Sequence, residues 1–140
     1  MIGKRRNREI GNLGETIACN FLKSKGFSIL ERNYWRKWGE LDVVARGTSK
    51  EVHFIEVKTV SHETKADLDR EVTRLSARSD GSWRPEEQVH QFKLHQIHKA
   101  VETWLAEHNF MGDWQIDVVA VRLVPREKYA SVKYIENITV

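Results

Sequence analysis

Two short apolar segments with charged residues inside them most constrain how this chain can fold. Residues 41–45 and 52–58 each have the composition and alternation of a strand. The segment between them, residues 47–51, reads Gly-Thr-Ser-Lys-Glu and is typical of a hairpin connection. We therefore expect the two segments to pair as antiparallel strands.

The charged residues of this hairpin are predicted to gather on shared faces. Side chains alternate across a strand, so Glu40 and Asp42 share one face, and Glu56 and Lys58 share one face. A charge buried without a partner is costly. Asp42, Glu56 and Lys58 must therefore meet each other, a metal ion, or water in a cleft.

Composition sets the class of protein. A chain of 140 residues, 40% hydrophobic and 31% charged, suits one globular domain over residues 1–140. Its net charge of +3 is compatible with nucleic acid without requiring it. Cys19 is the only cysteine and no apolar run approaches the roughly 20 residues of a membrane span. These features predict a soluble cytoplasmic protein with no membrane partner.

A first amphipathic helix is predicted over residues 8–25, with Gly26 as its stop. Glu15 lies on the flank of its apolar stripe, close in projection to Ala18 and Leu22. Two interpretations stay open for this carboxylate. It reaches into a cleft at the edge of the sheet, or it is a surface carboxylate near the positive end of the helix.

Three basic segments are candidates for contact with nucleic acid. They are an N-terminal arm at residues 1–8, an aromatic and basic run at residues 31–38, and residues 60–84, predicted to be a mobile insertion with a marginal helix over 66–77. A solvated terminus, an edge strand and an idle loop are the respective structural alternatives. The residues assigned to nucleic-acid binding are Arg5, Arg6, Arg36, Lys37, Arg70 and Arg74.

The rest of the chain completes an α/β pattern. The expected elements are a strand over residues 27–30, a helix over 85–108, a central strand over 114–123 and an edge strand over 131–135. Lys93 falls inside the apolar arc of the second long helix, so it either snorkels outward or points at buried carboxylates or phosphate. We therefore predict a mixed central β-sheet flanked by α-helices.

The hairpin residues suggest a chemistry. The carboxylates of Asp42 and Glu56, with the backbone carbonyl of Val57, form an oxygen-ligand set that suits Mg²⁺ or Mn²⁺. Lys58 near that ion can orient water and stabilise developing charge, and Glu15 can complete the ligand set. The structural alternative is an ion pair in a half-buried sheet.

The motifs resemble those of the YraN family of bacterial proteins. The segments that carry the resemblance are residues 11–18, 29–34, 39–45, 54–59, Val89 with Lys93, and 116–121. The resemblance implies a restriction-endonuclease-like fold, similar to that of archaeal Holliday junction resolvases. It also implies a nuclease site made by Glu15, Asp42, Glu56 and Lys58, with Glu40 and Lys93 as accessories.

Three functions fit these features. The first is a metal-dependent DNA endonuclease, for which branched or damaged DNA is a candidate substrate. A homodimer would suit a two-fold symmetric junction, although the sequence shows no clear dimer surface. The alternatives are a non-catalytic nucleic-acid-binding module and an interaction scaffold in DNA processing. A nuclease requires the carboxylates and a divalent ion, whereas simple binding should survive their loss and weaken with salt.

Overall fold

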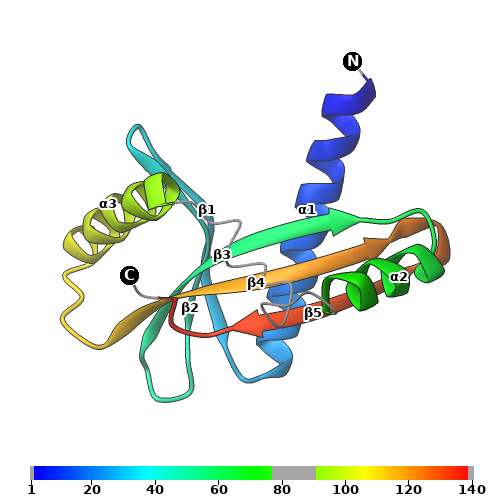
Figure 1. The fold of residues 1–140 in the computed structure, drawn as a ribbon. Helices are drawn as coiled ribbons and strands as arrows, with labels where there is room; N and C mark the ends of the chain where they lie inside the picture. Colours follow the sequence, from blue (N-terminus) through cyan, green and yellow to red (C-terminus); the bar gives the residue numbers. More distant parts are fainter. Residues whose placement is uncertain (1, 77–90, 139–140) are drawn as a thin grey trace.

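The computed structural model describes residues 2–76 and 91–138 (Figure 1). The helices are α1 (Ile2–Ser24), α2 (Lys65–Ser76) and α3 (Gln91–Glu107). The strands are β1 (Ser28–Arg36), β2 (Gly39–Arg46), β3 (Val52–Ser61), β4 (Trp114–Val124) and β5 (Tyr129–Ile135). A short 3-10 helix, η2 (Pro125–Glu127), joins the last two strands.

The strands form one five-stranded mixed sheet in the order β1-β2-β3-β4-β5. β3 and β4 are parallel, and every other neighbouring pair is antiparallel. A parallel pair needs a crossover connection, which here contains α2 and α3. The predicted α/β class, a mixed sheet between helices, is confirmed.

Helices cover both faces of the sheet. Figure 1 shows α1 crossing one face and α3 lying against the other, beside the β1–β2 hairpin. Two hydrophobic clusters fill the two interfaces. The cluster under α1 contains Ala18, Cys19, Leu22, Val43, Ala45, Ile55, Val119, Val121 and Leu123. The cluster under α3 contains Tyr34, Leu41, Val44, Val52, Phe54, Ile97, Ala100, Val101, Trp104, Ile116 and Val118.

Several elements extend beyond their predicted bounds. The strand predicted over residues 27–30 continues to Arg36, so the aromatic and basic run forms the second half of edge strand β1 and its turn into β2. Residues 2–8, expected to be an arm, form the first turns of α1. Within residues 60–84 the structure contains the end of β3 and α2, the helix expected there. Residues 77–90, including the predicted start of α3, lie outside the described residues.

The predicted hairpin forms, but its two arms separate at the end away from the turn. β2 and β3 pair only from Val43–Arg46 to Val52–Ile55. Beyond this point β2 stays paired with β1 down to Gly39, while β3 stays paired with β4 up to Ser61. The two strands therefore fork, and the fork opens next to Asp42 and Glu56.

The contact of α1 with β3 gives a matched pair of predictions. A Cβ at Gly14 would lie 2.0 Å from Oγ1 of Thr59, whereas no described heavy atom lies within 4 Å of one at Gly11. Gly11→Ala should therefore stabilise the protein by about 0.5–1 kcal/mol through helix propensity. Gly14→Ala should destabilise it by about 1–3 kcal/mol through overpacking. Urea unfolding of both variants tests this, and a stabilising Gly14→Ala would show that α1 does not pack this closely on β3.

In the described residues, no helix is both long enough and apolar enough to span a membrane.

Candidate active site

Two carboxylates meet at the fork between β2 and β3. Glu56 is 4% exposed, although it lies in the middle of an apolar strand. Asp42 accepts a hydrogen bond of 2.8 Å from the backbone N–H of Val57, which the separation of the strands leaves available. Asp42 and Glu56 lie close enough for the charge of Glu56 to raise the pKa of Asp42. The predicted pairing of these two acids is therefore present in the structure.

Burial and the neighbouring acid together change the protonation of Asp42. Burial, and then the negative charge of Glu56, raise the pKa of Asp42 to about 8 against the lowering effect of the Val57 N–H. The nearby charge of Glu15 raises it further. At neutral pH and without a cation, Asp42 therefore retains its proton.

The cation that touches this pair comes from α3. Nζ of Lys93 lies 2.5 Å from Oε1 of Glu56. Burial disfavours the charge of Lys93, but its hydrogen bond to Glu56 and the charges of Glu56, Asp42 and Glu40 raise its pKa overall. Lys93 therefore remains an ammonium, and one positive charge faces two acids.

Glu15 reaches the same region from α1. Its pKa is raised by burial, is lowered in part by Arg32, and is raised again by the charges of Glu40 and Glu56. Its Oε1 is buried and has no hydrogen-bond partner among the described residues. Of the two interpretations open from the sequence, the structure therefore favours a carboxylate held near the fork. Glu40, the other predicted accessory, is exposed beside it on β2.

Lys58 lies on the strand that carries Glu56, and its role at a metal ion stays a prediction. It follows Glu56 by two residues on the same face of β3 and is half-buried. Among the described residues, no ion pair joins it to Asp42 or Glu56. Lys93 makes that contact, so of the two orientations open from the sequence it has the one that points at buried carboxylates.

The fit of a metal ion can be tested on these residues. In the part of the chain that the structure describes, no three acidic, histidine or cysteine side chains are close enough together to hold an ion. Asp42 and Glu56 provide two oxygen donors, and the carbonyl of Val57 is the third donor expected from the sequence. A buried Asp42 with a raised pKa and an unpartnered oxygen on Glu15 are features that a hard divalent cation would satisfy. The two carboxylates and the Val57 carbonyl are oxygen donors of the kind that Mg²⁺ or Mn²⁺ prefers, so binding of either ion stays a prediction.

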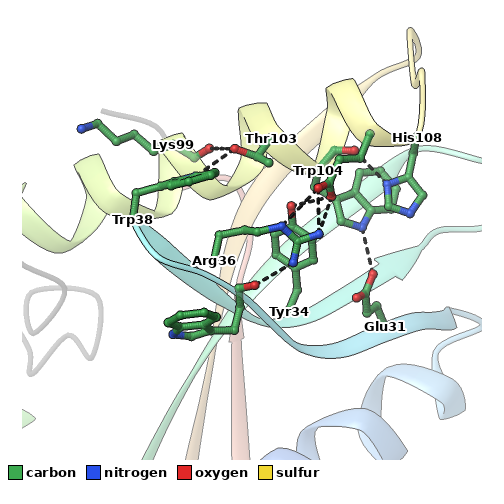
Figure 2. A network of polar contacts seen from close by, with 10 residues as sticks. Glu31, Tyr34, Arg36, Trp38, Lys99, Thr103, Trp104 and His108 are labelled. Carbon is green, nitrogen blue, oxygen red and sulfur yellow. Dashed lines mark hydrogen bonds and ion pairs between the residues drawn. The ribbon is translucent and has the colours of Figure 1, made fainter.

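The residues assigned to nucleic-acid binding divide into three groups. Arg36 forms an ion pair of 2.7 Å with Glu107 and lies over the ring of Tyr34, so its guanidinium is already bound (Figure 2). Arg70 is exposed and pairs with Asp67, while Lys37 is exposed at the β1–β2 turn. The side chains of the last group, Arg5, Arg6 and Arg74, lie outside the described residues.

A second buried polar cluster was missed by the sequence analysis. Asp117 on β4 is 0% exposed and accepts hydrogen bonds from Tyr134 (2.6 Å), Gln115 (2.7 Å) and the N–H of Asn137 (2.8 Å). Nδ1 of His53 lies 2.6 Å from the same carboxylate. The sequence signal for this cluster was the presence of Asp117 and His53 inside otherwise apolar strands.

This second cluster has a structural role. Nε2 of His53 faces Glu51 at 3.2 Å, while Nδ1 faces Asp117, so both ring nitrogens contact carboxylates. Neither nitrogen is left to act on a substrate. The cluster instead ties β3, β4, β5 and the segment after β5 together.

The chain is similar to known proteins over most of its length. The model of a family described as "Uncharacterised protein family UPF0102" matches residues 14–121. The chain is 36% identical over 136 residues to a UPF0102 protein of Geotalea daltonii, covering 96% of this chain and 92% of that protein. It is 38% identical over 135 residues to a UPF0102 protein of Pelobacter propionicus, covering 94% and 82%.

The chain is also similar to a third relative and to a solved structure. A UPF0102 protein of Campylobacter jejuni is 34% identical over 114 residues, covering 80% of this chain and 82% of its own. The solved structure is Pyrococcus furiosus SfsA in complex with Ca²⁺, with 14% identity and a TM-score of 0.33. The match covers 94% of this chain and 64% of SfsA.

Proposed function

The chain belongs to the uncharacterised protein family UPF0102, the YraN family that its motifs indicated, and we propose that it is a metal-dependent DNA endonuclease. The observation that carries the proposal is the pair of acids, Asp42 and Glu56, at the fork of β2 and β3. A structural ion pair would match charges. Here a second buried acid, Asp42, lies beside the Lys93–Glu56 ion pair, and burial and then the charge of Glu56 raise the pKa of Asp42.

The residues at the fork have distinct roles in this proposal. The carboxylates of Asp42 and Glu56, with the Val57 carbonyl, would hold Mg²⁺ or Mn²⁺. When bound, such an ion neutralises phosphate charge and makes water more acidic. The N–H of Val57 donates a hydrogen bond to Oδ2 of Asp42. This bond holds the carboxylate in one orientation at the fork.

The surrounding side chains would stabilise charge and accept a proton. Lys93 keeps its ammonium charged beside Glu56, where it can stabilise negative charge that develops on a phosphate. Glu15 offers a buried oxygen without a hydrogen-bond partner in the described residues, and its raised pKa suits it to accept a proton from water. Lys58, on the same face of β3 as Glu56, is assigned to orienting the substrate phosphate.

One observation favours a second function. No group of three potential ligand side chains is assembled within the described residues, and Lys93 already neutralises part of the charge of Glu56. A protein that only binds nucleic acid would need no assembled metal site. In that case binding would survive loss of the acids and would fall with rising salt.

Metal-dependent cleavage separates the two functions. End-labelled four-way, flap, single-stranded and linear duplex DNA should be incubated with the wild type in Mg²⁺, in Mn²⁺ and in EDTA. We expect cleavage of at least one substrate in a divalent ion, its loss in EDTA, and a loss of more than about 100-fold in Glu56→Gln.

The control for this experiment is Glu102→Gln, which removes an exposed acid from α3 outside the fork. It should cut like the wild type. Binding without cleavage of any substrate, unchanged by Glu56→Gln, would favour the binding module instead.

A further inference from the structure

We infer that the pocket between the β1–β2 turn and α3 binds an unpaired nucleotide by stacking its base, so that the substrate is single-stranded or locally unpaired DNA. This inference rests on the proposed nuclease function, because it assigns a substrate class to the same site. The pocket has a volume of about 330 Å³, within the range of sites for small ligands, roughly 300–1,000 Å³. It is lined by Trp35, Lys37, Trp38, Glu40 and Lys93, among others.

The pocket lies next to the carboxylate site and shares Lys93 with it. Lys93 lines the pocket and also contacts Glu56, and Glu40 lines it from the strand that carries Asp42. A nucleotide in the pocket would therefore place its neighbouring phosphate at the fork. The shared Lys93 is what connects the pocket to cleavage.

The pocket presents aromatic surface to solvent. Trp38 lines the pocket and is 45% exposed, although its side chain is large and apolar. Exposed aromatic faces are the usual platforms for bases in single-stranded nucleic acid. The bases of a paired duplex are stacked on one another and cannot use such platforms.

Trp38 is held in place before any ligand binds. Its Nε1–H donates a 2.9 Å hydrogen bond to Oγ1 of Thr103, which in turn donates to the carbonyl of Lys99. Figure 2 shows the indole lying along α3 with this edge toward the helix. A fixed ring loses little freedom when a base stacks on it, which favours binding.

The neighbouring glycine shows how closely the turn approaches α3. A Cβ at Gly39 would lie 2.5 Å from the backbone carbonyl oxygen of Gln96. The backbone of the turn therefore rests on the helix. This contact gives the pocket a rigid wall.

The charges around the pocket favour stacking over phosphate binding as the source of affinity there. Arg36 is neutralised by Glu107, Lys93 by Glu56, and Glu40 adds a negative charge. Lys37 is the one lining cation without a partner among the described residues. Binding should therefore depend on the base and on Trp38, with a small contribution from salt-sensitive contacts.

Binding to DNA with and without bases tests this inference. A fluorescein-labelled 12-mer of thymidine and an abasic 12-mer carry the same backbone charge, and their affinities should be measured by anisotropy in EDTA. We expect the wild type to bind the thymidine strand about tenfold more tightly than the abasic strand. Trp38→Ala should remove this difference, and Trp38→Phe should retain most of it.

The control for the binding experiment is a variant outside the pocket. Leu30→Ala removes another exposed apolar side chain from β1 outside the pocket lining and should behave like the wild type. Equal affinity for the two strands would overturn the inference, as would a preference that Trp38→Ala leaves intact. A dimer that Trp38→Ala converts to monomer, with no change in base preference, would identify the pocket as a protein interface and would also overturn it.

The same proteins tested for cleavage distinguish this inference from the nuclease proposal. Base-dependent binding in EDTA without cleavage in Mg²⁺ or Mn²⁺ would refute the nuclease and leave the nucleotide pocket standing. Cleavage that occurs without base-dependent binding would refute the pocket and leave the nuclease standing.

Discussion

Asp42→Asn is expected to abolish divalent-dependent cleavage while making the metal-free protein more stable at neutral and alkaline pH. Asparagine can still accept the hydrogen bond from the N–H of Val57, so the fork should keep its shape. It cannot become negative, so it removes both an ion ligand and the repulsion with Glu56. We expect cleavage to fall by more than about 100-fold, since even residues that only support metal ligands contribute about 10–100-fold.

The stability effect has a defined pH window. The folded protein keeps the proton of Asp42 up to about pH 8, whereas the unfolded chain releases it near the ordinary pKa of 3.8. Between these values the folded state binds more protons, so the free energy of unfolding of the wild type should fall as pH rises, by about 1 kcal/mol per pH unit. Asp42→Asn should lack this slope.

Urea unfolding of the wild type and Asp42→Asn at pH 5, 6.5 and 8, in EDTA, measures the effect. Glu102→Gln, which alters an exposed carboxylate on α3, is the matched control and should follow the wild type. Mn²⁺ should then stabilise the wild type more at pH 8 than at pH 5, because the ion requires the ionised acid. Parallel pH profiles for the wild type and Asp42→Asn would contradict the assignment of a raised pKa to Asp42.

Asp117→Ala is expected to cause the largest loss of stability of any single substitution outside the hydrophobic core. The change leaves His53 without its 2.6 Å partner and removes the acceptor used by Tyr134 and the N–H of Asn137. Breaking a buried ion pair by removing one partner costs about 3–5 kcal/mol. That is a large fraction of the roughly 5–15 kcal/mol that stabilises a typical domain.

The pH dependence of this cluster identifies its charges. Burial disfavours the charge of His53, but hydrogen bonds and charge from Asp117 and Glu51 raise its pKa overall. Its contribution is therefore fully present below the ordinary pKa of 6.5 and is lost as pH rises through the raised value. Burial likewise opposes the charge of Asp117, but His53, the Asn137 N–H and Tyr134 lower its pKa overall. This second contribution is present above the ordinary 3.8 and is lost as pH falls through the lowered value.

Asp117→Asn keeps the size of the side chain and removes its charge, so it isolates this effect. The difference in unfolding free energy between the wild type and Asp117→Asn should be greatest between about pH 4 and 6.5. It should shrink at higher pH as His53 loses its proton. A difference that does not change with pH would show that the cluster is not held by an imidazolium.

The local sequence pattern was sufficient to predict the hairpin and to place its two acids on neighbouring strands. Alternation in β2 and β3 placed Asp42 and Glu56 on facing strands, and the connection of residues 47–51 made those strands neighbours. The same alternation could not show that the strands separate beyond Val43. Separation depends on the competing pairings with β1 and β4, which are properties of the whole sheet.

Contacts between distant elements were not predictable in the same way. The sequence left open whether Lys93 snorkels outward or points at buried carboxylates, and only the docking of α3 on the sheet places it against Glu56. Arg36 looked available for nucleic acid until the structure paired it with Glu107, 71 positions away. Such partners depend on how a helix docks, which hydrophobic periodicity alone does not determine.

The most direct measurement is the single-turnover rate at which the wild type and Asp42→Asn cut the same end-labelled DNA in the same Mn²⁺ buffer. Circular dichroism on both proteins verifies that they are folded. We predict measurable cleavage by the wild type and a rate more than about 100-fold lower for Asp42→Asn. Equal rates for the two folded proteins would contradict the assignment of the Asp42–Glu56 pair as the catalytic centre.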